Sequence, residues 1–247
     1  MDQEQLKQQV AQVAADFVTA KLKPHDILGV GTGSTVNHFI AALHERNVSV
    51  RGAFSSSEAS SAALADIGIQ VFDSNCGERA ALYVDGADEI DARGALTKGG
   101  GGALTREKIV AALSDVFICL VDETKLVDRL GGFPIPVEVI PMARAHVAAR
   151  LAELGGEPRL REDFRTDNGN VILDVAQLEV QDPEDLECTL NNIPGVVENG
   201  VFWENRPTLA LVSCGCGVEV RGAKQMLASF ADLLQGTGVC CETTFSK

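Results

Sequence analysis

The sequence predicts an α/β protein: a Rossmann-like, mostly parallel sheet with helices on both faces, joined to a smaller α+β domain of ferredoxin-like type. Two observations support this. Short apolar segments alternate with segments of helical periodicity up to about residue 121, with short links between them. The character of the chain then changes at Gly131-Gly132, after which the pattern is strand, helix, two strands, helix and strand.

The first region opens with a helix over 4–20, because Leu6, Val10, Val13 and Phe17 recur at helical spacing. Pro24 lies just beyond it and marks its end. Apolar runs and turn residues then predict strands at 26–31, 48–55, 69–72, 81–85 and 116–121, and helices at 33–46, 57–68 and 105–114.

In the second region, prolines at both ends of PIPVEVIP predict an edge strand over 134–141. A helix at 182–193 is expected because Asp182 suits an N-cap and Pro183 the first helical position. The remaining predicted elements are a helix at 144–154, two strands around the turn at 166–170, strands at 196–202 and 208–213, and a helix at about 220–234. We therefore expect one domain over 1–130, completed by 206–247, and a smaller domain over 131–205 at an oligomer interface.

Composition limits the possible functions. A net charge of −14 argues against a nucleic-acid partner, and no apolar run approaches the ~20 residues of a membrane span. The N-terminus lacks the pattern of a signal peptide. Seven cysteines without regular spacing argue against a disulfide framework. These features predict a protein of the reducing cytoplasm.

The segment GVGTGST (29–35) follows a predicted strand and precedes a helix. Thr32, Gly33, Ser34 and Thr35 would place backbone N–H groups and hydroxyls at a helix N-terminus, which suits a phosphate group. A dinucleotide fingerprint fails because position 34 is serine instead of glycine. The alternative is a tight turn with a serine N-cap. In the serine-rich segment at 55–62 the hydroxyls could contact a polar ligand, but an N-capped helix explains them at least as well, so this segment is given no role.

Acidic residues and glycines dominate residues 85–108. Asp85 and Asp88 follow a predicted strand, at the sheet edge where such folds bind ligands, although solvated turn acids are the alternative. Four glycines (99–102) follow Lys98, whose charge could stabilise an oxyanion. Glu107 in the next helix suits a general base, unless it pairs with Arg106 or Lys108 on a solvated face.

Other candidates give weaker signals. Lys125 follows a predicted strand and could meet a phosphate, or could be an ordinary surface lysine. The Cys214-Gly215-Cys216 and Cys240-Cys241 pairs are too few or too close for a zinc site. The four histidines form no pair at i, i+4. No metal site is expected.

Taken together, YVDGADEID, KGGGGALTREKI, DETK, FPIPVEVIPMA, TDNGNVILD and IPGVVENGVF resemble the ribose-5-phosphate isomerase A family, in the same order from about Leu6 to residue 203. The resemblance implies reversible conversion of D-ribose 5-phosphate to D-ribulose 5-phosphate in the pentose phosphate pathway. It also implies no metal or organic cofactor, and a dimer or tetramer.

The same resemblance assigns roles to residues. Glu107 would be the general base that moves a proton between C2 and C1 through an enediolate. Asp85 would assist ring opening and hydroxyl proton transfer, and Lys98 would stabilise the enediolate. The substrate-binding positions would be Thr32, Gly33, Ser34, Thr35, Asp85, Gly86, Ala87, Asp88, Lys98, Gly99, Gly100, Gly101, Lys125 and Lys7.

The sequence argues against two other functions. A sugar-phosphate sensor without catalysis would carry a DNA-binding module or a replaced base, and this chain shows neither. A dinucleotide-dependent enzyme lacks its fingerprint spacing. The chain departs from the resembled family after about residue 215, where roughly thirty more residues follow. We expect a surface helix there, packed on the first domain or on a partner subunit.

Overall fold

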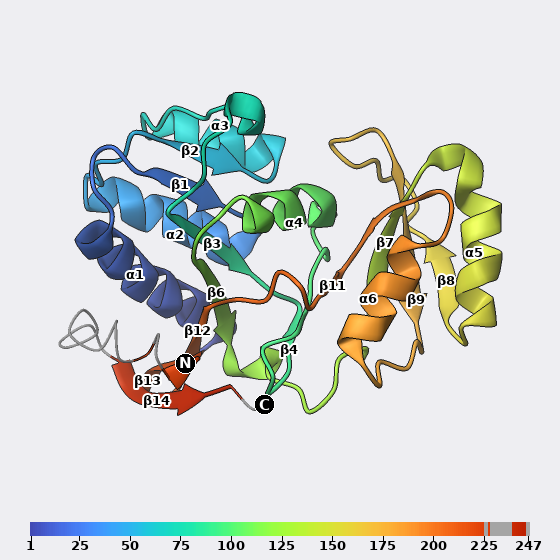
Figure 1. Ribbon diagram of the computed structural model, residues 1–247. Coiled ribbons are helices and arrows are strands. Elements are labelled where there is room, and N and C mark those ends of the chain that lie inside the picture. The colour runs from blue at the N-terminus through green and yellow to red at the C-terminus, as the bar shows by residue number, and fades with distance from the viewer. Residues whose placement is uncertain (225–226, 228–238, 246–247) are drawn as a thin grey trace. The chain divides into compact units, whose positions relative to one another are not determined.

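The computed structural model describes residues 1–224, 227 and 239–245 (Figure 1). Two compact units are present. The first comprises Met1–Gly86, Ile109–Lys125 and Pro207–Lys247, and the second comprises Ala87–Lys108 and Leu126–Arg206. This division differs from the predicted domains chiefly in residues 87–108, which belong to the second unit.

The first unit contains a seven-stranded sheet in the order β14-β13-β12-β6-β3-β1-β2 (Figure 1). Neighbouring strands are parallel except β12 and β13, which form an antiparallel hairpin. The predicted mostly parallel sheet is therefore confirmed. The strands are β1 (Ile27–Val30), β2 (Gly52–Ser55), β3 (Leu82–Gly86), β6 (Phe117–Asp122), β12 (Leu209–Cys214), β13 (Gly217–Gly222) and β14 (Val239–Thr244).

Helices cover both faces of this sheet. Leu28 and Val30 of β1 face a core shared with α1 (Gln3–Lys21), α2 (Ser34–Glu45) and α3 (Glu58–Asp66). Gly29, between them, faces Tyr83 of β3 and Val110 of α4 (Leu104–Ala112) on the opposite side. The alternation follows from the period of two along a strand.

The second unit contains a four-stranded antiparallel sheet in the order β10-β7-β9-β8. Its elements follow the predicted order: β7 (Ile135–Val139), α5 (Arg144–Glu153), β8 (Glu157–Leu160), β9 (Val171–Ala176), α6 (Pro183–Asn191) and β10 (Val196–Asn199). The Asp182 side chain accepts the Glu184 N–H and Pro183 opens α6, as predicted. A small sheet adds β4 (Glu89–Ile90), β5 (Leu96–Thr97) and β11 (Val201–Phe202).

The structure corrects several predicted elements. Residues 69–72 contribute a single bridge, between Val71 and Ala53, because the chain turns at Asp73 into the short 3₁₀ helix η1 (Ser74–Cys76). The predicted edge strand is instead interior: β7 lies between β10 and β9. Pro136 is tolerated because pairing with β10 begins only at Val137.

The predicted start of the C-terminal helix, expected at about 220–234, is wrong because residues 220–222 belong to β13. Most of its remaining span lies outside the described residues. Strands β13 and β14 were not predicted, although the alternation of Val218 and Val220 with Glu219 and Arg221 is a strand signal. Within the described part of the chain, no helix is long and apolar enough to cross a membrane.

Candidate active site

Asp85 lies at the end of β3 in the first unit, and its side chain is completely buried. Its carboxylate accepts hydrogen bonds from the Gly86 N–H at 2.7 Å, the Thr32 N–H at 3.1 Å and the Tyr83 hydroxyl. A buried carboxylate is stable only when donors surround it in this way. The predicted alternative, a solvated turn acid, is therefore wrong for Asp85.

Glycine at position 31 makes room for this carboxylate. A Cβ atom there would lie 1.9 Å from the Asp85 Cγ, far inside van der Waals contact. The turn after β1 can therefore approach β3 closely, which brings the Thr32 N–H to Asp85.

The predicted phosphate-binding segment forms the turn between β1 and α2. Gly33, with φ of 119°, is the N-cap of α2 and supplies no side chain to cap it. Gly33 and Ser34 are exposed, and Thr32 and Thr35 are half-buried. The alternative of a serine N-cap is thus wrong. The helix presents backbone N–H groups and hydroxyls at an accessible N-terminus, which is favourable for an anion.

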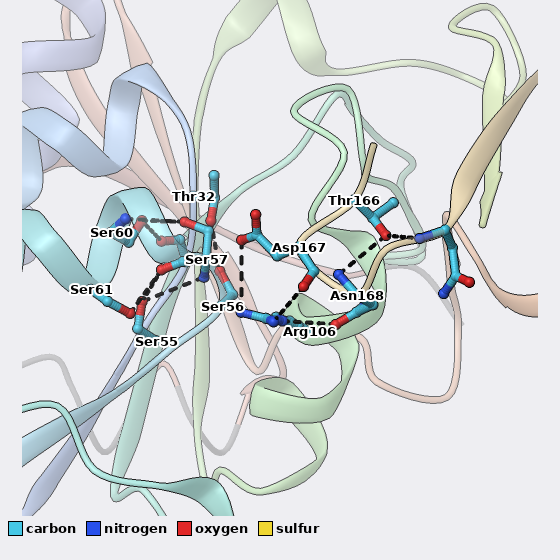
Figure 2. A network of polar contacts seen from close by, with 12 residues as sticks. Thr32, Ser55, Ser56, Ser57, Ser60, Ser61, Arg106, Thr166, Asp167 and Asn168 are labelled. Atoms are coloured by element: carbon cyan, nitrogen blue, oxygen red, sulfur yellow. Dashed lines mark hydrogen bonds and ion pairs between the residues drawn. The ribbon is translucent and has the colours of Figure 1, made fainter. Parts of the chain in front are cut away.

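A hydrogen-bonded cluster beside this turn is formed by Ser55, Ser56, Ser57, Ser60 and Ser61 (Figure 2). The Ser57 hydroxyl caps α3 by accepting the Ser60 N–H at 3.1 Å, which is the N-capped alternative left open by the sequence. The Ser60 hydroxyl donates to the Gly31 carbonyl at 2.7 Å, and the Ser56 hydroxyl lies 2.8 Å from that of Thr32. These serines hold the turn in place.

The two other predicted lysines of the first unit are partly accessible. Lys125 ends the 3₁₀ helix η2 (Glu123–Lys125), directly after β6. The Lys7 Nζ on α1 lies 3.6 Å from the Glu4 Oε2. The other carboxylate oxygen of Glu4, Oε1, lies 2.6 Å from the His38 Nε2 on α2. These contacts place Lys7 near the first turns of α2.

Lys98 and Glu107 form a buried ion pair in the second unit. The Lys98 Nζ lies 3.3 Å from the Glu107 Oε2, and the two side chains are 3% and 4% exposed. The alternative partners of Glu107 are engaged elsewhere: Arg106 with Asp167, and Lys108 with Glu187 at 2.6 Å. The reading of Glu107 as a solvated surface acid is therefore wrong.

The glycine loop between them is shaped by Asp88. The Asp88 carboxylate accepts the Gly100 N–H at 2.8 Å, and a Cβ at Gly100 would lie 2.6 Å from it. Gly100 and Gly101 are exposed. Arg161, which pairs with Asp174, donates to the Gly99 and Gly100 carbonyls at 3.2 and 3.1 Å. No local sequence signal around Arg161 predicts this contact.

Glu138 is a second residue that sequence reasoning missed. It is fully buried on β7 and accepts hydrogen bonds from the Thr105 hydroxyl, the Thr166 hydroxyl at 2.8 Å and the side-chain amides of Asn168 and Asn170. Thr105 lies two residues before Glu107. One carboxylate thus ties the start of α4 to the turn at 166–170.

Arg106 reinforces this connection, as Figure 2 shows. Its guanidinium donates to the Asn168 side-chain oxygen and to the Asp167 carbonyl, both at 2.9 Å. The helix that carries Glu107 is therefore attached to the 166–170 turn by both Thr105 and Arg106.

The predicted site residues fall into two groups. The first unit gathers Asp85, Gly86 and the turn 32–35, while the second gathers Asp88, Lys98, Gly99–Gly101 and Glu107. Ala87, half-buried, begins the second unit. Among the described residues, no three or more His, Cys, Asp or Glu side chains form a metal-binding group.

Comparison with known proteins identifies the family of the chain. Residues 53–215 match the family model of ribose 5-phosphate isomerase A, also called phosphoriboisomerase A. A ribose-5-phosphate isomerase A of Bordetella petrii is 55% identical over 88% of this chain and 97% of its own length.

Solved structures agree. Ribose 5 phosphate isomerase A of Neisseria gonorrhoeae has a TM-score of 0.84 at 40% identity, covering 89% of this chain and 96% of its own. A D-ribose-5-phosphate isomerase in complex with phospho-erythronic acid has a TM-score of 0.82 at 35% identity, covering 89% and 99%. The chain belongs to the ribose 5-phosphate isomerase A family and is an isomerase that interconverts D-ribose 5-phosphate and D-ribulose 5-phosphate.

Proposed function

We propose that Glu107 is the general base of this isomerase and that Lys98 stabilises the enediolate. The observation that carries the proposal is the buried ion pair, with 3.3 Å between the Lys98 Nζ and the Glu107 carboxylate. A base and a cation held side by side, away from water, can serve one reacting centre: the base takes a carbon-bound proton while the cation meets the oxygen that gains charge.

The proton balance follows from these roles. Glu107 removes the proton from C2 of the open-chain aldose, and charge develops on the C1 oxygen. A proton then passes from the C2 hydroxyl to the C1 oxygen, and Glu107 returns its proton to C1. The N–H groups of Gly99–Gly101 would assist Lys98 in stabilising the enediolate.

Asp85 is proposed to open the sugar ring and to move the hydroxyl proton. Its support is its position, at the carboxyl end of a parallel strand, where α/β folds bind ligands. Hydrogen bonds from Thr32, Tyr83 and Gly86 hold the carboxylate in one orientation. Gly86, Ala87 and Asp88 follow directly and are proposed to contact the sugar.

The phosphate is proposed to bind at the N-terminus of α2, through the backbone and hydroxyls of residues 32–35, with Lys7 and Lys125 adding positive charge. The exposed, glycine-capped helix start supports this. The solved relative with phospho-erythronic acid carries a phosphorylated sugar acid as its ligand, which is the chemistry proposed for this chain. The sensor alternative finds no support, since the relatives are named as isomerases.

We also propose that the enzyme works in the cytoplasm as a homodimer or tetramer, with residues 131–205 at the interface. Within that region Met142 is 94% exposed and Ile140 45% exposed, and large apolar side chains on a surface favour association. Light scattering should show a smaller particle for Met142→Lys than for the control Glu162→Lys. Equal masses would remove this face from the interface.

The roles are tested by isomerisation of ribose 5-phosphate in D₂O with EDTA. Wild type should produce ribulose 5-phosphate, with deuterium at C1 only to the extent that the proton on Glu107 exchanges with solvent before it is returned. Glu107→Gln should be slower by ~10² or more. The matched control is Glu184→Gln, an exposed acid in the first turn of α6. If Glu107→Gln retains activity, Glu107 is not the base and Asp85 becomes the residue to test.

A further inference from the structure

Two cysteines meet at the hairpin turn between β12 and β13. Cys214 ends β12 and pairs with Gly217, so Gly215 and Cys216 form the two-residue turn. The sulfur atoms of Cys214 and Cys216 lie 3.0 Å apart. Cys216 is exposed, whereas Cys214 is half-buried and donates to the Gly217 carbonyl at 3.3 Å.

Neither cysteine takes part in the isomerisation chemistry proposed above. The family match ends at residue 215, inside the turn, so Cys216 lies beyond the part of the chain that the family model describes. Two thiols cannot complete a zinc site by themselves, and the described His, Cys, Asp and Glu side chains supply no group of three. The chemistry available to two adjacent thiols is thiol–disulfide exchange.

We propose that Cys214 and Cys216 are a reversible dithiol–disulfide pair that reacts with low-molecular-weight disulfides such as glutathione disulfide. A disulfide bond is about 2.05 Å long, so the two sulfur atoms need to approach by only about 1 Å. Exposed cysteine pairs whose partner is already in contact are the ones that oxidise reversibly.

The two cysteines take different parts in the reaction. The exposed Cys216 thiolate attacks one sulfur of glutathione disulfide, which breaks that S–S bond, forms a mixed disulfide and releases one glutathione. The Cys214 thiolate then attacks the Cys216 sulfur, forms the Cys214–Cys216 bond and releases the second glutathione. Two protein thiols are oxidised, and one disulfide is reduced to two thiols.

The pairing of β12 with β6 places the Cys214–Cys216 turn near Lys125. Ser213 of β12 pairs with Asp122 of β6, and β6 leads directly into η2, which holds Lys125. The turn therefore lies beside the segment that carries a proposed phosphate-binding lysine. The proposal of a redox pair does not depend on that role of Lys125.

The test exposes the full-length protein to glutathione and glutathione disulfide, followed by intact mass and peptide mapping. Wild type should become lighter by two hydrogen atoms, with the bond mapped to Cys214 and Cys216, and reductant should reverse it. Cys214→Ser should accumulate one glutathione on Cys216, since the resolving thiol is gone. Cys216→Ser should lose the intramolecular bond.

The control is Cys188→Ser, which removes an exposed cysteine elsewhere and should leave the bond intact. A wild-type protein that stays reduced would overturn the proposal. A stable glutathione adduct on Cys216 of the wild-type protein would also overturn it, as would a wild-type disulfide that maps to Cys240 or Cys241.

Discussion

The ammonium of Lys98 lies 3.3 Å from the carboxylate of Glu107, and both side chains are almost completely buried. Burying two charges costs free energy that their attraction offsets only while both are present. The pair is therefore better explained by chemistry than by stability.

Replacing Lys98 should separate the contribution of the ion pair to stability from its contribution to catalysis. Lys98→Met leaves Glu107 buried without this cation, so we expect a loss of about 3–5 kcal/mol in the free energy of unfolding, together with loss of isomerase activity. Lys98→Met combined with Glu107→Leu should recover stability but not activity. Denaturant unfolding and the isomerisation rate check both, with exposed Lys23→Met as control. If Lys98→Met alone had normal stability, the argument that Glu107 is destabilising when buried without Lys98 would be contradicted.

Gly31→Ala should disturb Asp85 directly. The added Cβ would lie 1.9 Å from the Asp85 Cγ, so the carboxylate or the turn must move. We expect destabilisation of about 1–3 kcal/mol and a large fall in kcat/KM. Gly215→Ala is the matched control, because its Cβ would meet no atom within 4 Å. Unchanged kinetics of Gly31→Ala would mean that the orientation of Asp85 does not matter.

Glu138→Gln should loosen the support of the proposed base. An amide presents N–H groups where the native carboxylate accepts from Thr105, Thr166, Asn168 and Asn170, so about 1–3 kcal/mol of stability should be lost. Hydrogen exchange should quicken at 166–170, and kcat should fall more than KM rises. Exposed Glu162→Gln should change neither. Faster exchange with unchanged kcat would make Glu138 purely structural.

Glu219 should contribute a pH-dependent stability to the first unit. Burial raises the pKa of its carboxyl, but hydrogen bonds from Arg221 and Thr243 and the charge of Arg221 outweigh this and lower the pKa below its usual 4.5. A lowered folded-state pKa gives stability that is present above the unfolded value and is lost as pH falls through the folded value.

Arg221→Met should therefore be less stable than wild type near neutral pH, and the difference should shrink as the pH falls through the folded-state pKa of Glu219. Unfolding midpoints measured across that range provide the check. A difference that stayed constant with pH would show that Arg221 acts by packing alone.

Much of the candidate site was predictable because its signals are local. The glycine run, the acids after a strand and Glu107 at a helix start all lie within 24 consecutive residues, 85–108. Turn chemistry and periodicity therefore found them. The alternation in 217–222 was also local, and reading it would have replaced part of the predicted C-terminal helix with β13.

Other features depend on contacts between distant residues. Arg161 reaches the Gly99 carbonyl across 62 positions, and nothing near Arg161 in the sequence indicates this partner. Glu138 alternates with Val137 and Val139 like a solvent-facing acid, but β7 is interior and Glu138 is fully buried. Burial of this kind is decided by which strands become neighbours, which no single segment specifies.

The acceptor role of Glu138 has a consequence for folding. Its four donors lie 28 to 33 residues away in the chain, on both sides of it. Contacts between distant residues require loop closure and form slowly compared with a helix turn. Helix α4 can thus acquire its hydrogen bonds early, while the setting of Glu107 waits for the hairpin of β8 and β9 to close. In refolding, the return of catalytic turnover would mark the completion of the second unit's architecture, well after its helical content is restored.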